Sequence, residues 1–275
     1  TTRVIRPEFS IQGGIYPSTQ VIELFSANIS DTIRYTLNGS KPTLHSAIYE
    51  EPIFIDSTTV VRAQAFNFNI LPSTIKTETY IINENNFLPI LSIAVDSGYF
   101  WDEEVGIHLV GINGNYGCDG TWSNYNQDWE RPISLEYYAT NGVLGFKINA
   151  GVKIFGGCSR EHEQKSLAIY TKKYDSETIY YQIFGDKPIN EYKSFVLRNS
   201  GSDWSHTPYY NNTGSMMRDA MMQSLVKNRM DIDYQAYQPS IIYINGKYWG
   251  ILNIREKLNG DYLAANHNID PDNVD

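Results

Sequence analysis

The first third of the chain consists of short hydrophobic runs separated by turn residues. Residues 32–37 alternate strictly, so Ile33, Tyr35 and Leu37 share one face of a predicted strand. The run ends at Asn38-Gly39-Ser40, where the glycine accepts the positive φ of a turn. Similar runs are residues 21–25, 52–55, 59–66 and 77–82. Short strands at this spacing, without a helical period, predict an immunoglobulin-like β-sandwich over residues 1–83.

The remaining chain, residues 84–275, follows the polar linker 83–86 and predicts a second domain. Residues 88–95 predict a buried strand, and residues 167–170 predict another. Two hairpins are expected, from 132–138 to 145–154 across Asn141-Gly142 and from 241–244 to 248–254 across Asn245-Gly246. Residues 101–127 are rich in Gly, Asn and aromatic residues without a period, which indicates a long surface excursion.

Helical patterns are few. Residues 215–229 predict a helix with an apolar face formed by Met217, Ala220, Met221, Ser224 and Leu225, and Ser215 is placed to cap its start. Residues 261–267 predict a short second helix. We therefore expect an α+β fold: a sandwich followed by a mostly antiparallel sheet with few helices.

The charge and composition exclude several function classes. The formal net charge is -9, which disfavours nucleic acid and anionic lipid as partners. The sequence has 21 Tyr, 11 Phe and 5 Trp, as is typical of β-rich proteins. No apolar run approaches the length of a membrane span, and no signal peptide is visible, as expected of a trimmed piece or of a mature product that begins at Thr1.

Cysteines and histidines give no metal-binding pattern. The two cysteines, Cys118 and Cys158, are compatible with one disulfide or with two free thiols. The five histidines are scattered, without the paired spacing of a zinc site, so we predict no metal site in this chain.

The densest group of residues suited to chemistry follows the predicted strand 145–154. Gly156, Gly157, Ser159 and Arg160 are followed by Lys165. Glycines permit close approach to the backbone, while Arg and Lys supply positive charge, so the segment suits an anion such as phosphate. A tight turn with ordinary surface charges is the alternative interpretation.

Three tryptophans of the aromatic excursion are candidates for surface recognition. Trp101, Trp122 and Trp129 alternate with Asn and Asp, a composition that can stack on sugar rings. Packing inside the loops is the alternative.

Two family resemblances lie on these residues. Gly13-Gly14-Ile15-Tyr16, residues 33–43 and Val61-Arg62-Ala63 resemble the chitobiase C-terminal or Fn3-associated module, although Asn38 replaces the usual Asp. Residues 156–166, 193–199 with Asp203, and 243–251 with Glu256 resemble, in order, the CotH spore-coat kinase family over about 88–275. The first resemblance implies a secreted accessory module, and the second implies an atypical protein kinase.

The CotH resemblance also implies roles for individual residues. Lys165 would hold the phosphates of ATP, helped by Gly156, Gly157, Ser159 and Arg160, and Glu256 would be a structural partner or a charge pair. The family also uses a divalent metal, Mg or Mn, and its aspartate-bearing motifs lie after the segment that matches residues 273–275. We therefore expect an incomplete kinase domain, inactive alone and without a tightly bound cofactor, with the catalytic residues beyond Asp275.

Two functions follow. The intact protein would be a secreted or cell-surface kinase of bacterial type that phosphorylates serine residues of a protein partner. Alternatively, it would be a non-catalytic cell-surface, spore or matrix scaffold that binds glycan or protein.

Overall fold

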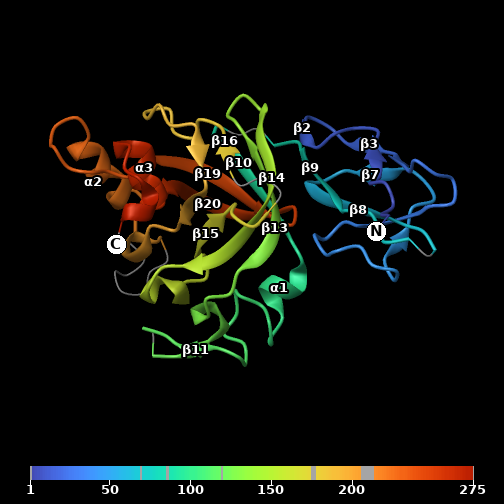
Figure 1. The fold of residues 1–275 in the computed structure, drawn as a ribbon, viewed down its shortest axis with the longest axis horizontal. Coiled ribbons are helices and arrows are strands. Elements are labelled where there is room, and N and C mark those ends of the chain that lie inside the picture. The colour runs from blue at the N-terminus through green and yellow to red at the C-terminus, as the bar shows by residue number, and fades with distance from the viewer. Residues whose placement is uncertain are drawn as a thin grey trace. The chain divides into compact units, whose positions relative to one another are not determined.

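The computed structural model describes residues 2–68, 70–84, 87–118, 120–174, 178–205 and 214–274, and most of its regular elements are strands (Figure 1). Contacts divide the chain into two compact units. The first contains residues 1–98, 134–147 and 243–248, and the second contains residues 99–133, 148–242 and 249–275. The predicted domain boundary between residues 83 and 84 stays a prediction.

In the first unit, three sheets share one hydrophobic core. Five strands pair in the order β2 (Gly14–Tyr16), β9 (Lys76–Ile82), β8 (Thr59–Phe66), β5 (Thr32–Thr36) and β6 (Ala47–Ile48). Two smaller sheets pair β3 (Gln20–Ile22) with β7 (Ile53–Ile55) and β1 (Glu8–Phe9) with β4 (Leu24–Phe25). Their buried side chains form one cluster that includes Ile22, Leu24, Ile33, Ile53, Val61 and Tyr80. The alternation in the sequence therefore placed β5 correctly, although Leu37 lies one residue beyond it and is 42% exposed, and the predicted strand 21–25 is divided between β3 and β4. Gly39 has the expected positive φ of 79°.

The largest sheet closes on itself. Its strands follow the order β10 (Ile90–Val95), β13 (Arg131–Tyr138), β14 (Leu144–Phe155), β15 (Ser166–Tyr170), β18 (Ser194–Arg198), β20 (Lys247–Glu256) and β19 (Tyr237–Ile244), a closed barrel. The prediction of an α+β fold with a kinase-like first lobe is therefore wrong, and the protein is mostly β. The predicted strands do form, but pairing between strands distant in sequence closes the sheet on itself, and the described α-helices are short, with 5, 9 and 8 residues.

The helix predicted over residues 215–229 is also shorter and differently anchored. It spans α2 (Arg218–Val226), and of its predicted apolar face only Ala220 is buried, whereas Met217, Met221 and Leu225 are exposed. Ser215 does not cap it alone: the Asp203 carboxylate accepts hydrogen bonds at 2.9 Å from the backbone N–H groups of Met217 and Arg218. The distant acid thus supplies the N-terminal acceptor.

The second short helix forms as predicted. It spans α3 (Gly260–His267), where Asn259 caps the first turn by accepting a hydrogen bond from the Tyr262 N–H. In the described residues, no helix is long and apolar enough to span a membrane.

The aromatic excursion contains short elements rather than a long loop. These are α1 (Ser97–Trp101), the hairpin of β11 (Asn115–Tyr116) and β12 (Trp122–Ser123), and the 3-10 turn η1 (Asn124–Asn126). Buried Asn124 organises them: its amide donates to the Glu103 and Gly106 carbonyls and accepts from the Asn113 N–H. One amide side chain therefore satisfies three backbone groups of the excursion.

Candidate functional site

The glycine turn, residues 156–165, joins β14 to β15 in the second unit. Gly156 has a φ of 120°, a conformation that side-chain-bearing residues rarely adopt, and a methyl group there would meet the Ser159 hydroxyl at 2.6 Å. Gly157 is exposed, and a methyl group there would meet no atom within 4 Å. The chain then enters the 3-10 turn η2 (Cys158–Glu161). Gly156 is therefore needed for its backbone conformation, whereas Gly157 leaves the backbone accessible to a ligand.

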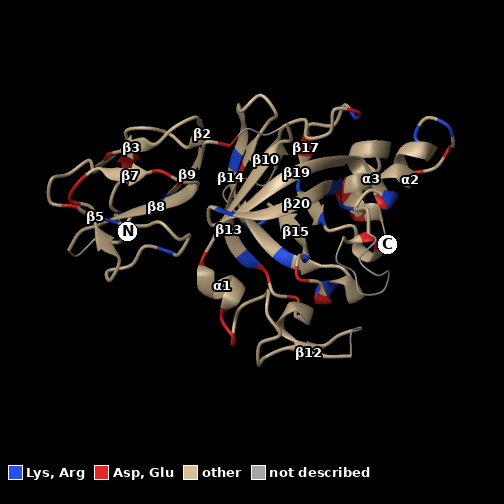
Figure 2. Ribbon diagram, turned by 180° about the vertical axis from the view of Figure 1, so that it is seen from behind, with Lys and Arg blue, Asp and Glu red and all other residues tan. Residues whose placement is uncertain are grey.

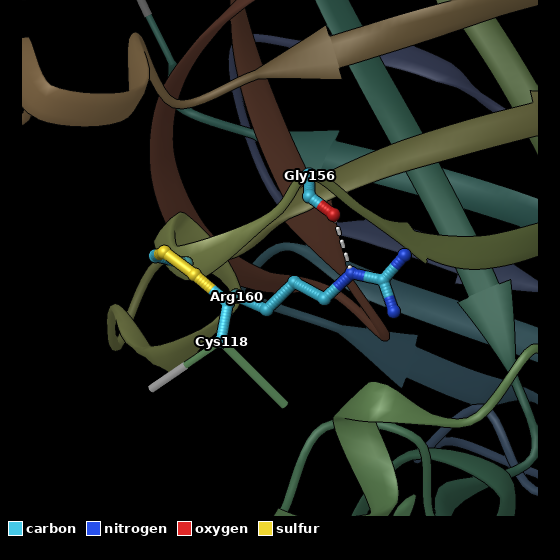
Figure 3. Close-up of a disulfide and its surroundings, with 4 residues drawn as sticks. Cys118, Gly156 and Arg160 are labelled. Atoms are coloured by element: carbon cyan, nitrogen blue, oxygen red, sulfur yellow. Dashed lines mark hydrogen bonds between the residues drawn. A yellow bond between two sulfur atoms is a disulfide. The ribbon is translucent and has the colours of Figure 1, made fainter. Parts of the chain in front are cut away.

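Arg160 folds back over the turn from which it starts. Its Nε donates to the Gly156 carbonyl at 2.7 Å, as Figure 3 shows, and its guanidinium also reaches the Tyr125 and Asn126 carbonyls at 3.5 and 3.4 Å. The side chain is partly buried. Arg160 thus fixes the turn and keeps a positive charge beside Gly156.

The Lys165 side chain points from the turn into the protein interior and not toward solvent. It is buried, and its ammonium donates to the carbonyls of Arg160 at 2.6 Å and His162 at 2.8 Å. The same ammonium lies 4.2 Å from the centre of the Tyr125 ring, a cation–π contact. Lys165 therefore acts on the shape and potential of the turn from inside.

The histidines beside the turn are held neutral. Burial, aided by the Lys165 charge, lowers the pKa of His108 to about 3. Burial also lowers the pKa of His162, which stacks on Trp204 with ring centres 4.8 Å apart. Neither ring adds a positive charge at neutral pH, so the positive charges of the turn are those of Arg160 and Lys165, and Glu161 and Glu163 of the same turn carry negative charges.

Hydrogen bonds join the separate sequence motifs behind the turn. The Ser166 hydroxyl donates to the Asn199 side chain at 2.8 Å, and the Asn199 amide donates to the Gln164 carbonyl at 2.7 Å. The Gln164 amide donates to the Trp249 carbonyl at 3.0 Å, and the absence of a side chain at Gly250 leaves it room. Three motifs far apart in sequence therefore support one turn.

A disulfide also fastens the turn. Cys118, at the tip of the β11–β12 hairpin, is bonded to Cys158, which follows Gly157 directly (Figure 3). The sequence left the pairing open, and the structure resolves it as one disulfide across 40 residues.

Glu256 does not join this group. In the strand register, Phe195 of β18 lies opposite Glu256 of β20 on one side and opposite Ile169 of β15 on the other. Lys165 precedes Ile169, the residue of β15 in line with Glu256, by four residues. At the rise of a strand this is a separation of roughly 13 Å along β15. Of the six residues predicted to bind phosphate, the structure brings together five and places Glu256 elsewhere.

Glu256 instead forms a buried ion pair that sequence reasoning missed. Its carboxylate accepts from the Lys187 ammonium at 2.6 Å, the Ala236 N–H at 2.8 Å and the Asn266 amide at 3.0 Å. The Lys187 ammonium also lies 4.4 Å from the centre of the Tyr234 ring. Lys187 stands in Gly185-Asp186-Lys187-Pro188, a composition typical of a loop with surface charges, so its burial had no signal in the pattern.

The neighbourhood of Glu256 contains a cavity of about 360 Å³. Its walls include β17 (Glu191–Tyr192), Thr178 just before β16 (Ile179–Tyr180) and helix α3, and Lys193 and Lys257 also line it. It is a concave site of the size that small ligands use.

The predicted recognition tryptophans lie in three different settings. Trp101 is only partly exposed and packs on Phe100 and Trp249, and the Arg131 guanidinium covers the half-buried Trp129 ring at 4.8 Å. Trp122 projects from β12 with 67% of its surface exposed. Only Trp122 of the three presents an open aromatic face.

A divalent metal has no evident site among the described residues. They contain no group of three or more His, Cys, Asp or Glu side chains that could hold a metal ion. The donor set of the glycine turn, cationic side chains and glycine backbone, suits the anionic part of a nucleotide and not the metal.

Two family models match this sequence. Residues 152–274 match the CotH kinase protein family, and residues 11–77 match the chitobiase/beta-hexosaminidase C-terminal domain. Both resemblances are confirmed. The CotH match is shorter than the predicted span of 88–275, but it contains the whole glycine turn and Glu256.

No curated protein gives a significant match. Among solved structures, Drosophila OTK, extracellular domains 3-5, matches with 12% identity, 72% coverage of this chain, 88% coverage of that chain and a TM-score of 0.22. A TM-score this low carries no argument about the fold.

Proposed function

We propose that this chain carries part of a CotH-like protein kinase that acts outside the cytoplasm. In that reaction the hydroxyl of a protein serine attacks the γ-phosphorus of ATP, the bond to the β-phosphate oxygen breaks, the serine proton passes to a base or to solvent, and ADP leaves. The observation that carries the proposal is that the CotH match begins in β14 and includes the turn at Gly156–Gly157, whose exposed glycine and cationic side chains suit phosphate.

The structure refines the roles within this proposal. Gly157 leaves its backbone open for a phosphate oxygen, and Arg160 provides charge at the edge of the turn. Lys165 is a positioning residue, because its ammonium holds the Arg160 and His162 carbonyls. No step through a metal is assigned to the described residues, since they do not supply its ligands.

The Cys118–Cys158 disulfide supports the proposal of a secreted or cell-surface location. The Cys118–Cys158 disulfide is exposed at both ends, and such bonds persist in oxidising compartments. The chitobiase-type module, whose relatives the resemblance places in secreted proteins, agrees with this location.

The proposal can be tested by measuring ATP affinity after one methyl group is added at Gly157. Gly157→Ala adds a side chain that clashes with nothing in the protein but occupies the space where a phosphate would approach. We expect it to weaken binding of ATP with Mn²⁺ about tenfold, equivalent to about 1.4 kcal/mol. Isothermal titration or nucleotide-dependent thermal stabilisation measures the change.

Gly185→Ala is the matched control. Gly185 is also exposed, and a methyl group there also meets no atom within 4 Å. It should leave affinity unchanged. Equal affinities of the wild-type chain and the Gly157→Ala variant, or no detectable ATP binding by the wild-type chain, would contradict a phosphate site at the turn.

A non-catalytic scaffold that binds glycan or protein is the second candidate function. The exposed aromatic pair on the β11–β12 hairpin is the observation that favours it.

A further inference from the structure

The β11–β12 hairpin exposes two aromatic rings that pack on one another. Tyr116 and Trp122 lie directly opposite across the two strands, and their ring centres are 5.9 Å apart with planes tilted by 58°. Tyr116 is 64% exposed and Trp122 is 67% exposed. Together they form a continuous apolar patch at the tip of a hairpin, where their rings contribute nothing to a core.

The hairpin is too small to hold this patch by itself. A two-stranded ribbon with two residues in each strand is at best marginally stable in water. It is fixed from outside: Asn115 donates to Gln127 at 2.9 Å, and the disulfide joins Cys118 to Cys158 beside the glycine turn. A pair of exposed rings kept in one arrangement by covalent and polar ties is organised before any ligand arrives, which lowers the entropic cost of binding.

The charges around the pair select the chemistry of the ligand. From Trp101 to Trp129 the sequence contains Asp102, Glu103, Glu104, Asp119 and Asp128 but no Lys or Arg. In Figure 2 the ribbon of the hairpin labelled β12 accordingly carries no blue. The hairpin itself therefore offers no cation to an anionic ligand such as nucleic acid, acidic lipid or sulfated glycan, although Arg160 of the glycine turn reaches the Tyr125 and Asn126 carbonyls.

Neutral polar side chains also stand on the hairpin: Asn115 donates to Gln127, and the Thr121 hydroxyl hydrogen-bonds with that of Ser123. A sugar ring offers an apolar C–H face for an aromatic ring and hydroxyl groups for such amides and hydroxyls. We propose that Tyr116 and Trp122 form a binding platform for a neutral glycan, held in place by the Cys118–Cys158 disulfide. This site is independent of the proposed phosphotransfer; it rests on the second candidate function and narrows its ligand to a neutral glycan.

Titration with sugars of different charge tests the platform. The probes are cellotetraose and the tetramer of N-acetylglucosamine as neutral sugars, a heparin tetrasaccharide as an anionic sugar and octalysine as a cationic peptide. We expect a neutral tetrasaccharide to bind and change tryptophan fluorescence, while heparin and octalysine do not. Trp122→Ala should weaken sugar binding at least about tenfold, and Tyr116→Ala about threefold. Both side chains are exposed, so their removal leaves the core intact.

Tyr180→Ala is the matched control, because Tyr180 is 71% exposed on another two-residue strand, β16. It should bind sugar like the wild-type chain. Reduction of the disulfide should weaken binding severalfold, and an unchanged affinity would refute the role of the tether.

Three outcomes would overturn the platform itself: no neutral sugar binds at about 10 mM, binding survives Trp122→Ala, or octalysine alone binds. The titration contains no nucleotide, and Gly157→Ala should leave sugar binding unchanged. The sugar titration can therefore refute the glycan platform without bearing on the proposed kinase function, which the ATP titration tests.

Discussion

Two buried lysines of the second unit occupy similar surroundings but do different work. Lys165 and Lys187 are 4% and 6% exposed, and each ammonium lies over a tyrosine ring, at 4.2 and 4.4 Å respectively. Lys165 donates to two carbonyls of its own turn, whereas Lys187 pairs with the Glu256 carboxylate and reaches the Asn266 side chain and the Tyr234 carbonyl. Lys165 shapes a single turn, and Lys187 joins segments up to 79 residues apart.

This difference separates a residue that serves a site from one that serves the fold. A buried ion pair must keep both members, because either charge alone is costly in the interior. Removal of a lysine that binds neutral groups, as Lys165 does, costs hydrogen bonds and a cation–π contact but leaves no buried charge without its partner. Burial and a tyrosine ring therefore do not by themselves distinguish the two roles, but the partners do.

The largest expected effect is at Lys187. Lys187→Ala leaves the Glu256 carboxylate buried without its cation, so we expect a loss of about 3–5 kcal/mol in the free energy of unfolding. Urea denaturation followed by tryptophan fluorescence measures it. Lys227→Ala is the control, since the Lys227–Asp186 pair is partly exposed and should contribute at most about 1 kcal/mol. Equal losses in the two variants would show that the buried pair is not special.

Lys165 should give a smaller loss of stability. Lys165→Met keeps most of the side-chain volume but leaves two carbonyls without their donor, so we expect about 1–3 kcal/mol. The same denaturation series measures it, and hydrogen exchange of residues 156–165 should rise more than that of β18. A loss as large as that of Lys187→Ala would remove the distinction between the two lysines.

A third lysine, Lys147 of the first unit, differs from both because it pairs with two carboxylates. Lys147 lies 2.7 Å from Glu78 and 3.0 Å from Glu136. Burial raises the pKa of Glu136, although the Lys147 charge opposes the shift. An acid with a raised folded-state pKa stabilises the fold below its ordinary pKa and loses that contribution as pH rises through the raised value.

The expected effect at Glu136 is the smallest. The unfolding free energy of the wild-type chain minus that of Glu136→Gln should fall by about 1 kcal/mol as pH rises from about 4 to about 8. Chemical denaturation at several pH values measures this difference. Glu8→Gln is the control of opposite sign, because the hydrogen bond from Lys76 lowers the pKa of Glu8, so its contribution is lost as pH falls. Parallel curves for wild type and Glu136→Gln would refute the expected loss of stability at high pH.

Much of the strand content could be read from the sequence, whereas the architecture could not. Alternation placed β5, and the Asn-Gly pairs placed the hairpin turns, where Asn245 and Gly246 both have positive φ. Closure of the barrel depends on pairings between distant strands, such as β18 with β20, which local patterns do not encode. Helix α2 was overestimated because its capping group, Asp203, is remote in sequence.

The candidate site was predictable as a turn but not as a set of contacts. Gly156, Gly157, Ser159, Arg160 and Lys165 are neighbours in sequence, so their proximity followed directly. The direction of the Lys165 ammonium, beneath the turn and against Tyr125, depends on a loop about 40 residues earlier. The separation of Glu256 depends on strand register, and its partner Lys187 looks like a surface residue in sequence.

Backbone chemical shifts during titration with ATP and Mg²⁺ test the central claim most directly, because they locate the bound phosphates residue by residue. The account predicts that the largest changes fall on Gly156, Gly157 and Ser159, and that they shrink in Gly157→Ala but not in Gly185→Ala. Changes confined to the cavity beside Lys193 and Lys257, with the glycine turn unaffected, would contradict it.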